Sequence, residues 1–145
     1  MKKLLRVSGL IAGLMMSANV MASTTPALSS QHLIITNHTN SDMTSKISGN
    51  CSSQLLGQAG ITPKGGVSDI TPSEILLACA ASILKGVPCS ADIYMSSNCG
   101  GASIATVSFD VNKGIIGLSN VDPNYTIDYS GFSATISGGP ALATR

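Results

Sequence analysis

Histidine, serine and carboxylate side chains are the groups that could support hydrolytic catalysis in this chain of 145 residues. It contains two histidines, His32 and His38, so a Ser–His–Asp site would have to use one of them. The nucleophile motif G-x-S-x-G does not occur. Glu74 is the only glutamate, and helix capping in the sequence T-P-S-E already accounts for it. We therefore expect no catalytic residue and no enzymatic activity.

Two groups of acidic and amide side chains could form further sites. Asp92 and Asp110 would form a carboxylate pair only if a hairpin register placed them opposite each other. Like charges facing each other across strands are typical of two solvated side chains. Asn120, Asp122 and Asn124 could suggest calcium, but D-P-N is common in turns and the glycine and glutamate of an EF-hand loop are missing.

Zinc and copper ligands are also poorly spaced. The cysteines are separated by 28, 10 and 10 positions, and His32 and His38 by six, outside the usual zinc spacings. Met43 and Met95 fall on faces that are expected to be apolar, so a role in the core explains them better. We expect no metal site and no cofactor.

The four cysteines, Cys51, Cys79, Cys89 and Cys99, predict two disulfides if the protein reaches an oxidising compartment. If Cys89 begins a strand and Cys99 lies at a hairpin tip, roughly 20–30 Å separates them. A disulfide requires Cα atoms within about 7 Å. A Cys89–Cys99 bridge would therefore require the first run to be something other than a strand. We predict the pairs Cys79–Cys89 and Cys51–Cys99.

Residues 89–111 are the stretch that positions two of these cysteines. Apolar and polar residues alternate on both sides of a turn at 96–101 that contains two glycines. A period of two is typical of half-buried strands, and glycine in a short polar gap indicates a hairpin. The residues expected on the apolar faces are Ala91, Ile93, Met95, Ala105, Val107, Phe109 and Val111.

Shorter runs before and after this hairpin extend the β pattern. The apolar run 32–36 and the alternating run 43–49 flank a polar loop and predict a first hairpin. Runs at 114–118, 125–129 and 132–137 are separated by turn-forming residues, whereas the glycine-rich stretch 52–68 is expected to be irregular. Seven or so short strands predict a mainly β fold, an antiparallel sandwich or small barrel.

One short helix is expected within residues 72–85. Thr71 is the predicted N-cap, Pro72 occupies the first helical position, and Glu74 can complete a capping box. Gly86 and Pro88 would end the helix. A buried strand through 75–79 is the alternative, and the cap favours the helix.

The N-terminus has the features of a secretory signal peptide. Lys2, Lys3 and Arg6 precede a short apolar run at 7–16, and small residues precede a predicted cleavage after Ala22. The run is too short to span a bilayer comfortably, and the alternative is an uncleaved anchor. We predict a signal peptide at 1–22, a flexible tail at 23–31, a single domain at 32–138 and a loose end at 139–145. The protein would then be periplasmic or extracellular.

Charge and exposed aromatics limit the expected partners. Removal of the signal leaves five basic and seven acidic residues, a net charge of about −2, so nucleic acid is not an expected partner. No second apolar run reaches spanning length, so no integral membrane segment remains. Tyr94 falls on a polar face beside Asp92 and is the one possible contact residue for a protein or surface glycan. The alternative is a tyrosine half-covered by a neighbouring element.

The cysteine-containing pattern from residue 79 to 110, with C-S-A-D-I-Y-M and N-C-G, resembles small exported proteins of intracellular Gram-negative bacteria such as Legionella. It covers about a quarter of the chain. The resemblance implies export and implies no activity.

Three classes of function are consistent with the sequence. The first is a secreted or periplasmic, non-enzymatic binding or interaction module, which accords with the export signal and the cysteines. The second is a subunit or accessory of a surface structure that assembles by strand addition. The third is a small secreted hydrolase or toxin, which would need His32 or His38 in a cleft beside an aspartate or a serine. The sequence favours the first.

Overall fold

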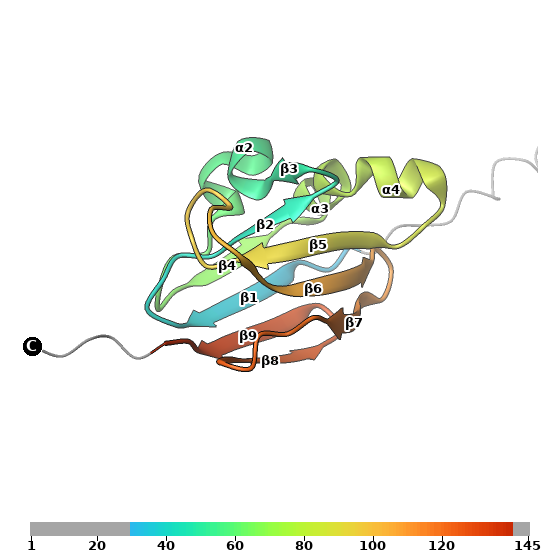
Figure 1. The fold of residues 1–145 in the computed structure, drawn as a ribbon. Helices are drawn as coiled ribbons and strands as arrows, with labels where there is room; N and C mark the ends of the chain where they lie inside the picture. Colours follow the sequence, from blue (N-terminus) through green and yellow to red (C-terminus); the bar gives the residue numbers. More distant parts are fainter. Residues whose placement is uncertain (1–29, 141–145) are drawn as a thin grey trace, which may run out of the picture.

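A computed structural model describes residues 30–140 as two β-sheets with short helices (Figure 1). The predicted signal peptide and most of the predicted tail lie outside the described residues. The first sheet has the strand order β4-β1-β9-β8, and the second has the order β3-β2-β5-β6-β7. The mainly β fold class predicted from the sequence is confirmed.

The elements have the following bounds. The first sheet contains β1 (Leu33–His38), β4 (Val67–Ile70), β8 (Tyr125–Ser130) and β9 (Ser133–Gly138). The second contains β2 (Thr44–Ile47), β3 (Asn50–Cys51), β5 (Cys89–Tyr94), β6 (Ser103–Asp110) and β7 (Gly114–Ser119). The helices are α2 (Ser52–Leu56), the 3-10 helix η2 (Gly57–Gly60), α3 (Pro72–Ala78) and α4 (Ala80–Lys85).

The hairpin at residues 89–111 is confirmed. Strands β5 and β6 pair antiparallel, with Cys89 opposite Phe109 and Ala91 opposite Val107. The turn between them contains Cys99, whose φ of 59° is unusual for a non-glycine residue. Strong alternation on both sides of a glycine-containing turn was sufficient to identify this element.

The predicted hairpin between residues 32–36 and 43–49 is wrong, because β1 and β2 belong to different sheets. Strand β1 pairs antiparallel with β4 and parallel with β9, which makes the first sheet mixed rather than purely antiparallel. Strand β2 pairs instead with β3 and β5. A two-residue turn at Ser48 and Gly49, with φ values of 52° and 85°, joins β2 to β3, as in type I′ hairpins.

A buried asparagine holds the chain where it crosses between the sheets. Asn37 has no exposed surface, and its amide nitrogen donates to the carbonyl oxygens of Ser41 at 2.8 Å and of Thr62 and Pro63 at 3.2 Å. Its amide oxygen accepts from the backbone nitrogen and hydroxyl of Thr39. This network links the loop after β1 to the segment before β4, a connection that local turn preferences do not reveal.

The stretch 52–68, expected to be irregular, contains α2, η2 and the beginning of β4. Helix α2 and η2 fold back tightly, and the Ser52 hydroxyl donates to the Gly60 carbonyl at 2.6 Å. A Cβ atom at Gly60 would collide with the backbone carbonyl of Ser52, so glycine is required there. The glycines therefore mark a close approach of ordered backbone rather than an absence of structure.

The capping box is confirmed, and the alternative of a strand at 75–79 is wrong. The Thr71 hydroxyl accepts from the Glu74 backbone nitrogen at 3.3 Å, and the Glu74 carboxylate accepts from the Thr71 nitrogen at 2.8 Å. Gly86, in the left-handed conformation, ends α4.

The expectation of at most one short helix is wrong, since α2, α3 and α4 are all present. Within residues 30–140, no helix has the length and apolar composition needed to cross a membrane.

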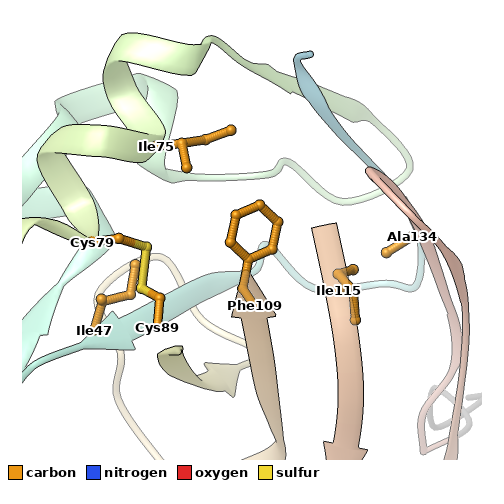
Figure 2. Packing of buried hydrophobic residues seen from close by; sticks show 7 residues of the cluster. All are labelled: Ile47, Ile75, Cys79, Cys89, Phe109, Ile115 and Ala134. Carbon is orange, nitrogen blue, oxygen red and sulfur yellow. A yellow bond between two sulfur atoms is a disulfide. The ribbon is translucent and has the colours of Figure 1, made fainter. Parts of the chain in front are cut away.

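The core lies between the sheets and beneath α3. Figure 2 shows Ile75 of α3 and Phe109 of β6 projecting toward each other, with Ile115 of β7 and Ala134 of β9 beside them. A second cluster comprises Met43, Ile93, Ile104, Ala105 and Ile136. Residues of both sheets contribute to each cluster, so formation of the core depends on association of the two sheets.

Candidate functional site

Both disulfides have the predicted pairing. Cys51–Cys99 joins the end of β3 to the turn between β5 and β6, and Cys79–Cys89 joins the end of α3 to the beginning of β5. The Cα–Cα distances are 5.9 and 5.5 Å, within the range of native disulfides. The second bridge closes a segment of ten positions that contains the whole of α4.

Tyr94, the proposed contact residue, is half-buried on β5. It pairs with Thr44 of β2, and the Lys46 ammonium of the same strand lies 5.4 Å from the ring centroid. A neighbouring strand therefore covers part of the ring, as in the alternative stated for this residue. The cation–π contact is an interaction within the domain.

The two histidines lie at opposite ends of β1, and His32 contacts an aspartate. Its Nδ1 is 2.6 Å from Oδ1 of Asp69 on β4, with both side chains largely exposed. Asp69 is opposite Ile34 in the β1–β4 ladder, whereas the adjacent Ser68 is buried and donates to the Ile61 carbonyl. Because neighbouring residues of a strand point to opposite faces, Ser68 does not lie beside the His32–Asp69 pair.

A polar depression of about 610 Å³ lies beside this edge of the first sheet. Asp42, Gln58, Asp69 and Ser97 contribute to its wall, and neither histidine is among the lining residues. Ser68 also lines the depression, and Asp69 is the lining carboxylate that contacts His32.

Asp92 and Asp110 are not paired. The register places Asp92 opposite Thr106, whose hydroxyl donates to the Asp92 carboxylate at 2.8 Å. Asp110 instead accepts from the backbone nitrogens of Asn112 and Lys113 in the turn before β7. Each carboxylate therefore has a local structural role.

The turn at Asn120, Asp122 and Asn124 is held by its own hydrogen bonds. The Asp122 carboxylate accepts from the backbone and side-chain nitrogens of Asn124 at 2.9 and 3.0 Å. Burial raises the pKa of the nearby Tyr125 phenol, and the Asp122 carboxylate raises it further. In the described part of the chain, no group of three or more His, Cys, Asp and Glu side chains could hold a metal ion.

Four large apolar residues are exposed on α3, on α4 and in the turn that follows α4. Together we call them the α3–α4 surface, and they are Leu77, Ile83, Leu84 and Val87, which are 57%, 37%, 88% and 51% exposed. Figure 1 shows α4 at the rim of the fold. Between Ile75 and Ala91 the only charged residue is Lys85. Contiguous exposed apolar patches mark interaction sites, and here four large apolar residues are exposed within eleven positions of the chain.

No exposed apolar surface was expected on the helix predicted within residues 72–85. A signal was nevertheless present at residues 75–78, where four apolar residues follow each other. A helix turns by about 100° per residue, so four consecutive side chains cannot all face one core. Ile75 is buried and Leu77 is exposed, as this geometry requires.

The architecture defines a class of small, disulfide-bonded proteins with two β-sheets and short helices along one side. A family model described as "T2SS substrate NttC" matches residues 7–139. The chain therefore belongs to the NttC family of type II secretion system substrates, and it is an exported protein. The resemblance to small exported proteins of Legionella is confirmed.

A solved structure shows the same fold. The crystal structure of the Legionella pneumophila type II secretion system substrate NttC aligns with a TM-score of 0.60 and 21% sequence identity. The alignment covers 77% of this chain and 100% of that protein. No curated protein matches the chain.

Proposed function

We propose that this protein is a secreted, non-enzymatic interaction module that binds a partner protein through the α3–α4 surface. The observation that carries the proposal is the clustering of four exposed apolar residues within eleven positions, Leu77 to Val87. Membership of a family of type II secretion substrates supports release to the extracellular space. The predicted signal peptide at 1–22 would direct the first step of this export.

The chemistry of the α3–α4 surface favours a protein partner over a glycan. Burying an exposed leucine or valine contributes about 1.5–3 kcal/mol, so contact with an apolar groove would be favourable. Sugar recognition relies on exposed aromatic faces, and residues 75–91, which carry the α3–α4 surface, contain no aromatic residue. Lys85 is the only charge on the segment, so an acidic group at the rim of the partner's groove would complement it.

The Cys79–Cys89 disulfide supports this role because it limits the conformational freedom of the projecting segment. Both cysteines are buried, so the segment 79–89, which contains α4, is anchored at its two ends in the core. A segment held in its bound conformation loses less entropy on association than a free loop. Reduction of this disulfide should therefore weaken binding.

Assembly by strand addition is the second candidate. Strand β8 lies at one edge of the first sheet and is six residues long, so it offers an unpaired backbone edge to another strand. Tyr129 of β8 is 41% exposed and would lie in such an interface. A small hydrolase is less well supported, because Ser68 and the His32–Asp69 pair lie on opposite faces of β4.

The proposal is tested by comparing proteins captured by the oxidised domain and by two variants. Leu84→Asp changes the most exposed residue of the α3–α4 surface, and Ile116→Asp changes a 47% exposed residue of β7 as a matched control. Quantitative mass spectrometry of culture fluid and eukaryotic cell extracts should identify a protein retained by the wild type and Ile116→Asp but lost with Leu84→Asp. Equal capture by all three forms would refute the α3–α4 surface as the binding site.

A further inference from the structure

An apolar cavity of about 110 Å³ lies between the two sheets and α3. Twenty residues line it, from both sheets and from α2 and α3, and Ser45 is the only polar residue among them. Figure 2 shows part of this region, where Ile75 projects from α3 toward Phe109, with Ile115 and Ala134 to one side. The cavity is separate from the α3–α4 surface, since Leu84 does not line it.

The composition of the chain explains why space remains in the core. There is no tryptophan and there are only two phenylalanines, of which Phe109 lines the cavity. Small side chains face the space from three different elements: Ala78 from α3, Ala91 from β5 and Ala134 from β9. Protein interiors are normally packed with few voids larger than a water molecule. A cavity of this size is therefore an unusual feature of so small a domain.

Water is a poor occupant of this cavity. A buried water normally makes two to four hydrogen bonds to polar groups. Within residues 30–140, every buried side-chain nitrogen or oxygen already has a hydrogen-bond partner. An apolar cavity of about 150 Å³ engineered into another protein stays dry and binds benzene or xenon. The lining here is likewise almost wholly apolar, at a slightly smaller volume.

We propose that this cavity is a binding site for a small, uncharged, apolar group. The volume fits a xenon atom, a single aromatic ring or a short length of alkyl chain. A free aromatic molecule and the tail of a fatty acid share this chemistry, because both present only carbon and hydrogen to the wall. The wall includes α3, a helix of only seven residues, and local opening of this helix would widen access for the ligand.

The proposal is tested on the intact, oxidised protein by methyl-region NMR and by thermal unfolding. Benzene and xenon represent free apolar molecules, and decanoate represents a fatty-acid tail. Each ligand that enters should cause saturable shifts of the Ile75, Ile115 and Ile136 methyl signals and should raise the midpoint of thermal unfolding. Binding of benzene without binding of decanoate assigns the site to free apolar molecules. Binding of both shows that the site also accepts the tail of a fatty acid.

Variants that fill the cavity distinguish internal binding from surface binding. Ala134→Ile and, as a second test, Ala91→Ile each add three carbon atoms to the wall with a residue suited to a strand. Either variant, if folded, should weaken benzene binding by about tenfold or more. Leu84→Ser alters the α3–α4 surface alone and should leave benzene binding unchanged. The inference is overturned by an absence of saturable shifts in the wild type, or by wild-type affinity in a folded Ala134→Ile or Ala91→Ile variant.

Discussion

Removal of the Cys51–Cys99 disulfide by Cys→Ala substitution at both positions is expected to lower the free energy of unfolding by about 4 kcal/mol. The bridge spans 48 positions. In the chain-entropy treatment, a loop of this length reduces the entropy of the unfolded chain by an amount worth about 4.1 kcal/mol at 25 °C. The Cys79–Cys89 bridge spans ten positions, and the same relation gives about 2.7 kcal/mol.

The effect of lost core packing must be separated from the effect of lost loop closure when the two double variants are compared. Cys51, Cys79 and Cys89 are all buried, so both double variants also lose core contacts. The loop effect acts on the unfolded state alone, which becomes more expanded when a long cross-link is removed. A more expanded unfolded state exposes more surface and raises the dependence of unfolding free energy on urea.

The assay is equilibrium unfolding in urea followed by far-ultraviolet circular dichroism, because the chain has no tryptophan. The Cys51/Cys99 double variant should show the larger increase in urea dependence, and the Cys79/Cys89 double variant serves as the short-loop control. A loss below about 1 kcal/mol for Cys51/Cys99, or equal urea dependence in the two variants, would refute the loop-closure reasoning.

Three further predictions concern single side chains. Asn37→Ala should lower the free energy of unfolding by about 2–3 kcal/mol in chemical unfolding, because buried carbonyls lose their hydrogen-bond donor. As a control, substitution of the exposed Asn50 in Asn50→Ala should change it by less than about 0.5 kcal/mol. Thr71→Ala should cost about 1 kcal/mol through loss of the capping box, and an unchanged urea midpoint would contradict that role. Because the pKa of the Tyr125 phenol is raised in the folded protein, the same phenol in the unfolded chain loses its proton at a lower pH. Stability should therefore fall as pH rises above 10.0. Tyr125→Phe should make that fall shallower in urea titrations across this range, and an identical pH profile would contradict the argument.

The sequence predicted well the features that depend on neighbouring residues. Alternation at residues 89–111 identified β5 and β6, and the spacing of Thr71 and Glu74 identified the beginning of α3. The length of a strand was enough to disfavour a Cys89–Cys99 bridge, and the structure has the predicted pairing. These inferences succeeded because the relevant physics acts over a few residues or over the length of one strand.

Long-range pairing was decided by the tertiary structure. A short apolar run such as residues 32–36 can pair with many strands, and only association of the sheets selects β4 and β9 as the neighbours of β1. The contact between His32 and Asp69 follows from that pairing and bridges 37 positions. No local pattern identifies such a contact.

The same distinction applies to the proposed sites. The sequence alone predicted export, two disulfides and the β class, and it contained no recognisable catalytic motif. Which side of α3 faces the core, and therefore which leucines face solvent, depended on where the helix is anchored by Cys79–Cys89. The cavity between the sheets depended on how twenty side chains from distant segments fill a shared volume. Local propensities act along the chain, whereas exposure and packing are set by what the rest of the chain brings to the same place.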